Sequence, residues 1–420
     1  MRILWITNII LPIISKDLGL PQSNYGGWLT SLADDIVSTN EHELIICFPF
    51  KSNRTIHGHI NGIEYINFDY KKTLEYYDKN LKSKFIDIIK QFKPDIVHIF
   101  GTEFPHSFSM IEAAKETGLI NKTLIHIQGM VSIYAKHFKA SIPVKYYIGF
   151  SFRDFLRKSN MNMREKRMSS LGNYERLAIK NAIHVSGRTT WDFECTKRIN
   201  EGIKYHYCNE SLRAPFYENK WNYENCDKFT LFTTQGESPI KGLHYLLEAL
   251  SLVSKKHPEA KLYIAGSNPT LIKWYRRTSY QNYILKLIKL YKLQSNVVFT
   301  GQLTQDQMCQ RLIKSNIFIL PSSIENSPNS LGEAMLVGVP CISSYVGGVP
   351  DLLTHNVEGF LYQTDATYML AHYIEFIFRQ NKEFLNDLSL STRKRAQSTH
   401  NRSNNLKCIL SIYKEINFNL

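Results

Sequence analysis

The segment Ser322–Pro340 reads SSIENSPNSLGEAMLVGVP and contains two glutamates, Glu325 and Glu333, eight residues apart. The apolar run Ile317–Leu320 just before it predicts a short buried strand. The residues Leu331–Val337 have helix-forming composition, and the Gly-Val-Pro sequence after them predicts the end of a helix. Glu325 is therefore expected on a loop at the carboxyl end of a strand, and Glu333 in the helix that follows.

The loop between this strand and this helix predicts a site for a nucleotide-sugar. Its residues Ser327–Ser330 supply an N-cap and backbone N–H groups, and a helix N-terminus of this kind binds phosphate. Glu333, one turn inside the helix, can bind both hydroxyls of a ribose, and Glu325 can bind a second sugar. Further contacts to this ligand are expected from the residues around the glutamates, which are Asn326, Ser327, Asn329, Ser330 and Leu331.

The Glu325/Glu333 pair resembles the E-x7-E motif of the family-four retaining glycosyltransferases (glycosyl transferases group 1), which have the GT-B fold. The usual pattern, E-x-F-G-x3-x-E, has a glycine where this sequence has Pro328, but the small-residue loop and the Glu-Ala-Met ending are kept. The resemblance covers nearly the whole chain. It implies an α/β protein of two Rossmann-like domains facing each other across a cleft, with the last helix, Leu406–Ile416, crossing back onto the first domain.

Length and composition agree with two globular domains. The chain has 420 residues, of which 43% are hydrophobic and 12% aromatic, and this length exceeds one typical core. Its longest apolar stretches fall short of the roughly 18 residues of a membrane-spanning helix, and Met1–Thr7 predicts a strand rather than a signal peptide. The seven cysteines are scattered, which favours reduced thiols and a cytoplasmic location.

The chain is basic, with a formal net charge of +14 and a pI of about 9.2. Nucleic acid and anionic membranes are the usual partners of such a surface, although an AT-rich genome also produces many lysines. The segment Lys145–Arg167 combines cations with aromatic residues, which suits a membrane surface; a solvated basic loop and helix is the alternative. We expect peripheral binding at the inner face of the plasma membrane through this segment, and no nucleic-acid partner.

Strand-like and helix-like segments alternate nearly throughout, which favours parallel α/β sheets. The expected strands are Ile3–Thr7, Leu44–Phe48, Ile96–Phe100, Thr123–Ile127, Ile183–Ser186, Phe229–Thr233, Lys261–Ala265, Val297–Thr300, Ile317–Leu320 and Cys341–Ser344. The expected helices are Trp28–Val37, Leu81–Phe92, Ser109–Thr117, Tyr245–Lys256, Gln305–Lys314 and Leu331–Val337. With a linker at Leu212–Cys226, residues 1–218 and 402–420 form an acceptor-binding domain, and residues 219–401 form a nucleotide-sugar-binding domain.

Two further motifs are expected at the donor. In Asn24-Tyr25-Gly26-Gly27, between the first strand and the first helix, the glycines Gly26 and Gly27 let a backbone approach a ligand; a plain strand-to-helix turn is the alternative. Lys241 precedes a helix, where its ammonium and the helix dipole can both face a diphosphate. It resembles the lysine of the family's R-x4-K region, but Gly236 stands in place of the arginine, so a fork-like phosphate clamp is missing.

The expected acceptor side follows two strands of the first domain. Thr102, Glu103 and His106 come after the strand that contains His98, and are expected to face the acceptor. Many relatives have a histidine where this chain has Gln128, and the resemblance implies that Gln128 contacts the transferred sugar, supported by His126. Arg188, after the next strand, suits either a phosphate contact or a brace between the domains.

The resemblance implies a retaining glycosyltransferase in which Glu325, Lys241 and Gln128 form the catalytic centre. Front-face attack needs no enzymic base, because the leaving phosphate accepts the proton, and neither a metal nor another cofactor is expected. The enzyme would move a sugar from a UDP- or GDP-linked donor to a glycan or lipid-linked glycan, in bacterial surface polysaccharide synthesis.

Two other classes of protein agree with the sequence less well than a glycosyltransferase does. An NAD-dependent oxidoreductase requires a G-x-G-x-x-G sequence after a strand, and the chain has none. A basic membrane- or nucleic-acid-binding protein with a GT-B scaffold and no transferase activity accounts for the charge, but not for the glutamate pair.

Overall fold

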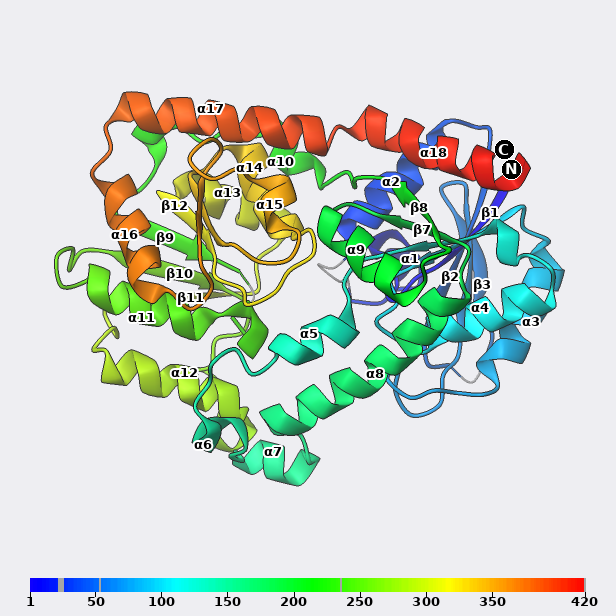
Figure 1. Cartoon of the computed structure of the whole chain (residues 1–420), viewed down its shortest axis with the longest axis horizontal. Helices are drawn as coiled ribbons and strands as arrows, with labels where there is room; N and C mark the ends of the chain where they lie inside the picture. The colour runs from blue at the N-terminus through cyan, green and yellow to red at the C-terminus, as the bar shows by residue number, and fades with distance from the viewer. Residues whose placement is uncertain (22–25, 53, 235, 419–420) are drawn as a thin grey trace. The chain divides into compact units, whose positions relative to one another are not determined.

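The computed structural model describes residues 1–21, 26–52, 54–234 and 236–418 (Figure 1). The chain folds into two compact units, each with its own parallel sheet. The first unit comprises Met1–Ile133, Ser169–Arg213 and His400–Leu420, and the second comprises Tyr134–Met168 and Ala214–Thr399.

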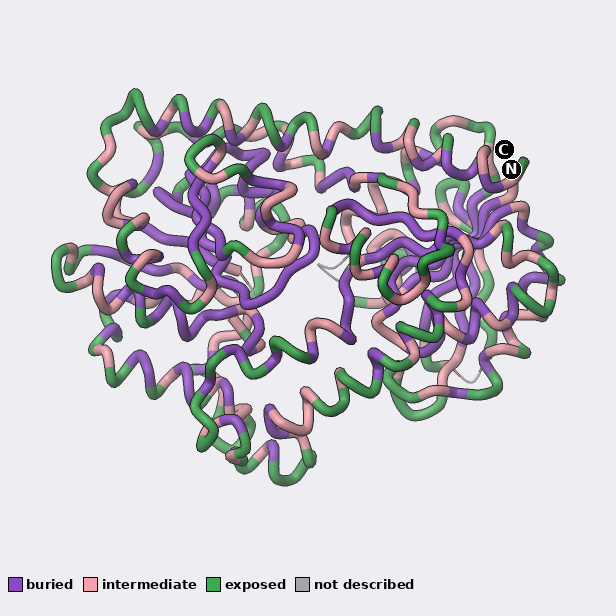
Figure 2. The backbone as a smooth tube through the Cα atoms, viewed as in Figure 1, coloured by how far each residue is buried: buried purple, intermediate pink, exposed green. Residues whose placement is uncertain are grey.

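The sheet of the first unit has the strand order β3-β4-β2-β1-β5-β6-β7-β8, and only the β3–β4 pair is antiparallel. Its central strands are apolar and buried on both faces, as a parallel sheet covered by helices requires (Figure 2). The strands are β1 (Arg2–Ile6), β2 (Glu43–Pro49), β3 (His57–Ile60), β4 (Ile63–Phe68), β5 (Ile96–Phe100), β6 (Thr123–His126), β7 (His184–Gly187) and β8 (Lys204–Tyr207).

Two apolar clusters cover the two faces of this sheet. One contains α3 (Leu81–Phe92) and α4 (His106–Glu116), and the other contains α2 (Gly27–Ser38) and the C-terminal helix α18 (Arg402–Phe418). Tyr413 of α18 fixes this helix to the sheet, because its hydroxyl accepts a hydrogen bond from Trp5 Nε1 at 3.1 Å and lies 2.6 Å from His98 Nδ1. The remaining helices are α1 (Pro12–Asp17), η1 (Ile120–Lys122), α9 (Thr190–Ile199), and α5 (Val131–His137) and α8 (Met161–Asn181), which both continue into the second unit.

The sheet of the second unit is wholly parallel, in the order β11-β10-β9-β12-β13-β14. The strand order reverses between β9 and β12, and the carboxyl ends of strands at such a switch point form the usual ligand site of an α/β sheet. The strands are β9 (Thr230–Thr233), β10 (Lys261–Ala265), β11 (Val297–Gly301), β12 (Ile317–Leu320), β13 (Cys341–Ser344) and β14 (Phe360–Tyr362).

The helices of the second unit begin at local caps where the sequence provides them. Thr278 and Thr304 form capping boxes with Gln281 and Gln307, at the starts of α12 and α13. The elements are α6 (Val144–Tyr147), α7 (Phe152–Arg157), α10 (Ala214–Glu218), η2 (Tyr223–Asn225), η3 (Pro239–Lys241), α11 (Leu243–Val253), η4 (Trp274–Arg276), α12 (Ser279–Leu290), α13 (Gln305–Lys314), α14 (Asn329–Val337), α15 (Val349–Leu352), α16 (Thr367–Phe378) and α17 (Lys382–Thr399). Among the described residues, no helix combines the length and the apolarity that crossing a membrane requires.

The predicted α/β class is confirmed, and so is a C-terminal helix that belongs to the first unit. The chain divides within the predicted linker, but Tyr134–Met168 belongs to the second unit rather than to the first. Contacts with α11 and α12 explain this difference: His244 Nε2 lies 2.7 Å from the Ala140 carbonyl, and Asp154 accepts a hydrogen bond from the Ser279 amide at 2.6 Å.

We predict that Tyr413→Phe lowers the free energy of unfolding by about 1–3 kcal/mol, because Trp5 and His98 then lose a buried hydrogen-bond partner. Urea unfolding followed by circular dichroism measures this change. Tyr368→Phe is the control: its side chain is 66% exposed, and it should change stability by less than about 0.5 kcal/mol. Equal stability of the two variants would show that the hydroxyl does not hold α18.

Candidate active site

The switch point of the second unit brings Lys241 and Glu325 together. The loop after β9 leads through η3 to Lys241, and the loop after β12 carries Glu325. Lys241 Nζ donates to Glu325 Oε1 at 2.7 Å, and Ser322 Oγ donates to the same oxygen at 2.7 Å. The contact between Lys241 and Glu325 joins residues that are 84 positions apart in the chain.

Glycines allow the loops after β9 and β13 to contact the loop after β12 directly. Gly242 has a φ of +69°, and a Cβ there would lie 1.8 Å from the Pro321 carbonyl oxygen. Gly347 has a φ of +49°, and its Cβ would lie 1.8 Å from the Glu325 carbonyl oxygen. Only glycine fits both the conformation and the space, so these two positions fix the backbone on either side of the ion pair.

Helix α14 begins beside this pair, two residues earlier than predicted. Its N-cap is Pro328, within the predicted loop Ser327–Ser330, and no side chain caps it. The helix ends at Gly338, which has a φ of +86°. An uncapped first turn presents N–H groups and the positive end of the helix dipole, which together favour an anion.

The predicted donor residues of the second unit gather at this helix start, where most of them are buried. Glu333 lies one turn inside α14 and is 6% exposed, and Glu325 is 5% exposed. A carboxylate buried to this degree is stable only when it is paired or hydrogen-bonded, and Glu325 meets this condition through Lys241. Asn326, Ser327 and Leu331 are also buried, whereas Asn329 and Ser330 are half-buried.

The two glycines predicted as a ligand contact lie in the first unit, at the turn into α2. Gly26 caps the helix with a φ of +81°, and Gly27 is its first residue. A Cβ at Gly26 would lie 2.3 Å from Ile9 Cδ1, and one at Gly27 would lie 2.8 Å from Arg213 Cδ. Packing within the unit therefore explains why both positions lack a side chain. The contact of these glycines with a ligand stays a prediction. Asn24 and Tyr25 of the same motif lie outside the described residues.

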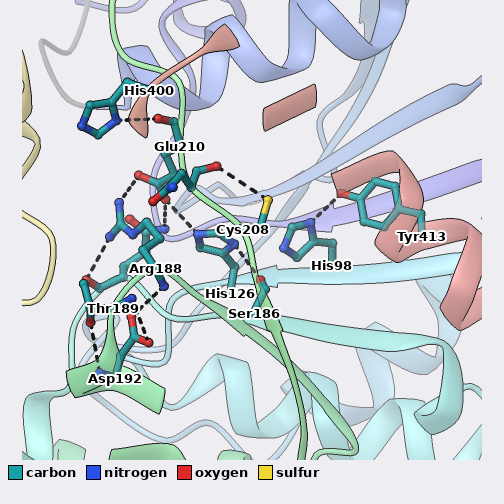
Figure 3. A network of polar contacts seen from close by, with 12 residues as sticks. His98, His126, Ser186, Arg188, Thr189, Asp192, Cys208, Glu210, His400 and Tyr413 are labelled. Atoms are coloured by element: carbon teal, nitrogen blue, oxygen red, sulfur yellow. Dashed lines mark hydrogen bonds and ion pairs between the residues drawn. The ribbon is translucent and has the colours of Figure 1, made fainter. Parts of the chain in front are cut away.

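The predicted sugar contact, Gln128, belongs to a buried polar network centred on Glu210 (Figure 3). Gln128 Nε2 donates to Glu210 Oε1 at 2.6 Å, and His126 Nε2 lies 3.0 Å from the same oxygen. Arg188 forms an ion pair with the other carboxylate oxygen, and His400 Nδ1 lies 2.8 Å from the Glu210 carbonyl. Gln128 and His126 thus contact the same carboxylate oxygen of Glu210.

Arg188 neutralises Glu210 inside the first unit. Both side chains are nearly inaccessible to solvent, at 3% and 2% exposure. Burial by itself raises the pKa of Glu210, but Arg188, His126 and Gln128 outweigh burial and hold the pKa below its usual value. Of the two roles considered for Arg188, a phosphate contact has no support here, since its guanidinium binds a carboxylate of its own unit.

The three predicted acceptor residues differ in exposure. Thr102 is fully buried and donates to Glu175 Oε2 at 3.3 Å. His106 is 2% exposed and packs between Phe68 and Phe104, and burial lowers its pKa to about 3. In this conformation both are part of the core rather than of a binding surface.

Glu103 alone among the three is half-buried. Asn8 Nδ2 donates to its Oε2 atom at 2.7 Å. Burial raises the pKa of Glu103 to about 7, so near neutral pH its carboxyl can either donate a hydrogen bond to an acceptor hydroxyl or accept one from it.

Sequence reasoning missed Glu210 and Glu175, which organise the polar interior of the first unit. Glu175 accepts hydrogen bonds from the Val131 and Ser132 amides at 2.7 and 2.9 Å, and thereby holds the start of α5. Glu210 follows β8, a short edge strand with no apolar run, so nothing local marked it. Within the described ranges, no cluster of three or more His, Cys, Asp or Glu side chains is arranged to hold a metal ion.

Comparison with known proteins relates the second unit to a family of glycosyltransferases. The model of the family "Glycosyl transferases group 1" matches residues 216–395. The putative glycosyltransferase YtcC of Bacillus subtilis is 26% identical over 206 residues, 48% of each chain. The putative colanic acid biosynthesis glycosyltransferase WcaL of Salmonella typhimurium is 29% identical over 143 residues, 32% of this chain and 33% of that one. The matched stretches thus span about half or less of these relatives.

A solved structure extends the likeness to the whole chain. Anabaena Alr3699/HepE in complex with UDP-glucose superposes with a TM-score of 0.67 at 15% identity, covering 99% of this chain and 100% of that one. Residues 216–395 therefore resemble the group 1 glycosyltransferases in sequence, and the chain as a whole has the GT-B fold.

We predict that Glu210→Ala lowers the free energy of unfolding by about 3–5 kcal/mol, because it leaves the Arg188 charge buried without its carboxylate. Glu194→Ala is the matched control. Glu194 pairs with Arg198 at 3.9 Å on the surface of the same unit, and its loss should cost less than about 1 kcal/mol. Urea unfolding of both variants compares the two costs, and a Glu210 variant as stable as the control would contradict the assigned pairing.

Proposed function

We propose that this protein is a retaining, metal-independent glycosyltransferase that moves a sugar from a UDP- or GDP-sugar to a glycan or lipid-linked glycan, in the synthesis of bacterial surface polysaccharide. One observation carries the proposal: Lys241 and Glu325 form an ion pair at the β9/β12 switch point, beside the uncapped start of α14. The structural relative crystallised with UDP-glucose supports a donor of this class.

The donor would use three kinds of group on the second unit. Its diphosphate would lie between Lys241 and the first turn of α14, where an ammonium and a helix dipole both favour negative charge. Glu333 would accept hydrogen bonds from the ribose hydroxyls. Glu325, whose Oε1 atom already receives Lys241 and Ser322, would use its other oxygen for hydroxyls of the transferred sugar.

Catalysis would rest on stabilising the leaving group. As the glycosidic bond breaks, negative charge would grow on the β-phosphate, and Lys241 and the α14 N–H groups would stabilise it. The same phosphate would take the proton of the acceptor hydroxyl, which attacks from the face that the phosphate leaves. Because two protein groups neutralise the diphosphate, we propose that no divalent metal takes part.

The acceptor would bind to the first unit. Glu103 is the best-placed contact, since its half-buried carboxyl has a pKa raised by burial to about 7. Gln128, which Glu210 orients through its amide nitrogen, would contact the transferred sugar.

The test is the hydrolysis of UDP- and GDP-sugars in EDTA, followed by release of the nucleoside diphosphate. We expect turnover with at least one donor. Glu333→Gln should raise the Kd of the nucleotide itself, by a factor that corresponds to about 1.5–3 kcal/mol for hydrogen bonds to a charged group. Glu325→Gln should lower kcat with little change in that Kd.

Glu375→Gln is the control for this experiment. Glu375 is also ion-paired, with Lys256 at 2.8 Å, and its side chain is 13% exposed, but it lies on α16 and should leave turnover unchanged. Full activity of both active-site variants would refute the donor site, and activity that returns only when magnesium or manganese is added would refute metal independence.

A further inference from the structure

The second unit carries a surface that is both apolar and basic. It is formed by residues 144–158, which include α6 and α7, and by residues 271–277, which include η4. We call it the α6–α7–η4 surface. The two segments are far apart in the sequence, and both belong to the second unit.

Specific contacts hold the two segments together. Asp154 of α7 accepts hydrogen bonds from the amide and the hydroxyl of Ser279, at 2.6 and 2.7 Å, at the start of α12. Phe152 packs against Trp274 with a ring separation of 5.8 Å, and Tyr146 against Tyr283 at 4.6 Å. The surface is therefore a fixed feature of the unit rather than two independent loops.

Large apolar side chains are exposed on this surface. Phe150, Phe152, Phe155, Leu156, Leu271 and Trp274 are between 50% and 82% exposed. A contiguous exposed apolar patch on a folded protein marks a docking site. Such a patch loses contact with water only when another surface covers it.

The two chain segments that carry the patch, with their flanking residues, contain few acidic residues. Residues 260–305 contain seven Lys or Arg and no Asp or Glu. Residues 134–168 contain nine Lys or Arg and only two acids, Asp154 and Glu165. Asp154 is 1% exposed and bonded to Ser279, and Glu165 accepts a hydrogen bond from Tyr147. Both carboxylates are thus engaged within the unit.

We propose that the α6–α7–η4 surface docks onto an anionic lipid bilayer, with Phe155, Leu156 and Trp274 inserted at the headgroup boundary. Exposed aromatic and leucine side chains next to lysines and arginines match both properties of such a membrane, its apolar interior and its negative surface. The docking itself does not depend on the proposed function. Its biological purpose does, because docking would bring the proposed enzyme to a lipid-linked acceptor.

The surface differs from the one expected from the sequence. That expectation rested on the cations and aromatic residues of Lys145–Arg167 and placed them in the first domain. The docking surface belongs to the second unit, which carries the candidate donor site, and η4 completes it with Trp274 and its neighbours. Apolar insertion, and not charge alone, is what the exposed side chains predict.

Co-sedimentation with vesicles tests the proposal. The full chain should bind vesicles of phosphatidylcholine with phosphatidylglycerol at least about tenfold more tightly than vesicles of phosphatidylcholine alone. Changing Phe155, Leu156 and Trp274 together to Ser should weaken binding to the anionic vesicles by at least about tenfold, since each of these side chains loses its apolar burial.

Two controls accompany this variant. Changing Val357, Tyr368 and Leu390 together to Ser removes three side chains of the same unit that are 50–66% exposed, and should leave vesicle binding unchanged. Binding of UDP is measured on every sample and should stay at the wild-type level. A failure of docking and a failure of the donor site are therefore separate results.

Tryptophan fluorescence reports insertion directly. Lipids that carry a nitroxide near the headgroup should quench the wild-type protein. Trp274→Phe keeps an apolar ring, so it should still bind vesicles but lose most of the quenching.

Three results would overturn the proposal. The triple variant could bind anionic vesicles as tightly as the wild type. The wild type could fail to distinguish anionic from neutral vesicles. Light scattering could show a dimer that the triple variant dissociates while neither protein binds vesicles, which would make a second copy of the chain the occupant of this surface.

Discussion

The pairing of β9 with β12 is the constraint on which the candidate active site depends. It places the loops after these two strands side by side, and Gly242 and Gly347 then allow backbone contacts that any side chain would prevent. Lys241 meets Glu325 as a consequence, although each lies in an otherwise ordinary loop. The start of α14 completes the arrangement, because this helix follows directly from the β12 loop.

The two units use buried carboxylates in opposite ways. Glu210 in the first unit is fully enclosed and satisfied by Arg188, His126 and Gln128, so it stabilises the unit and orients Gln128. Glu325 in the second unit is paired with Lys241, whose side chain is 24% exposed. An ion pair with a partner open to solvent can exchange one contact for a phosphate at modest cost, whereas an enclosed pair cannot. This contrast distinguishes the structural pair Arg188–Glu210 from the pair Lys241–Glu325, for which we propose a role in donor binding.

The sequence predicted the elements that carry a local pattern. The apolar runs of β5 and β12, and the periodic helices α3 and α13, were predicted with the bounds that the structure has. The strands β3, β4, β8 and β14 were missed, and β3 and β8 are edge strands without an apolar run. The position of Tyr134–Met168 depends on the hydrogen bond between Asp154 and Ser279, which is 125 residues away. The role of Glu210 likewise depends on contacts with His126, Arg188 and His400. Such long-range contacts leave no local mark in a single sequence.

A crystal structure of the full chain with UDP or GDP bound tests the central claim most directly. We predict that the diphosphate lies within hydrogen-bonding distance of Lys241 Nζ and of the first N–H groups of α14, and that the ribose hydroxyls donate to Glu333. A nucleotide bound away from the β9/β12 switch point, with Lys241 still paired only with Glu325, would contradict it.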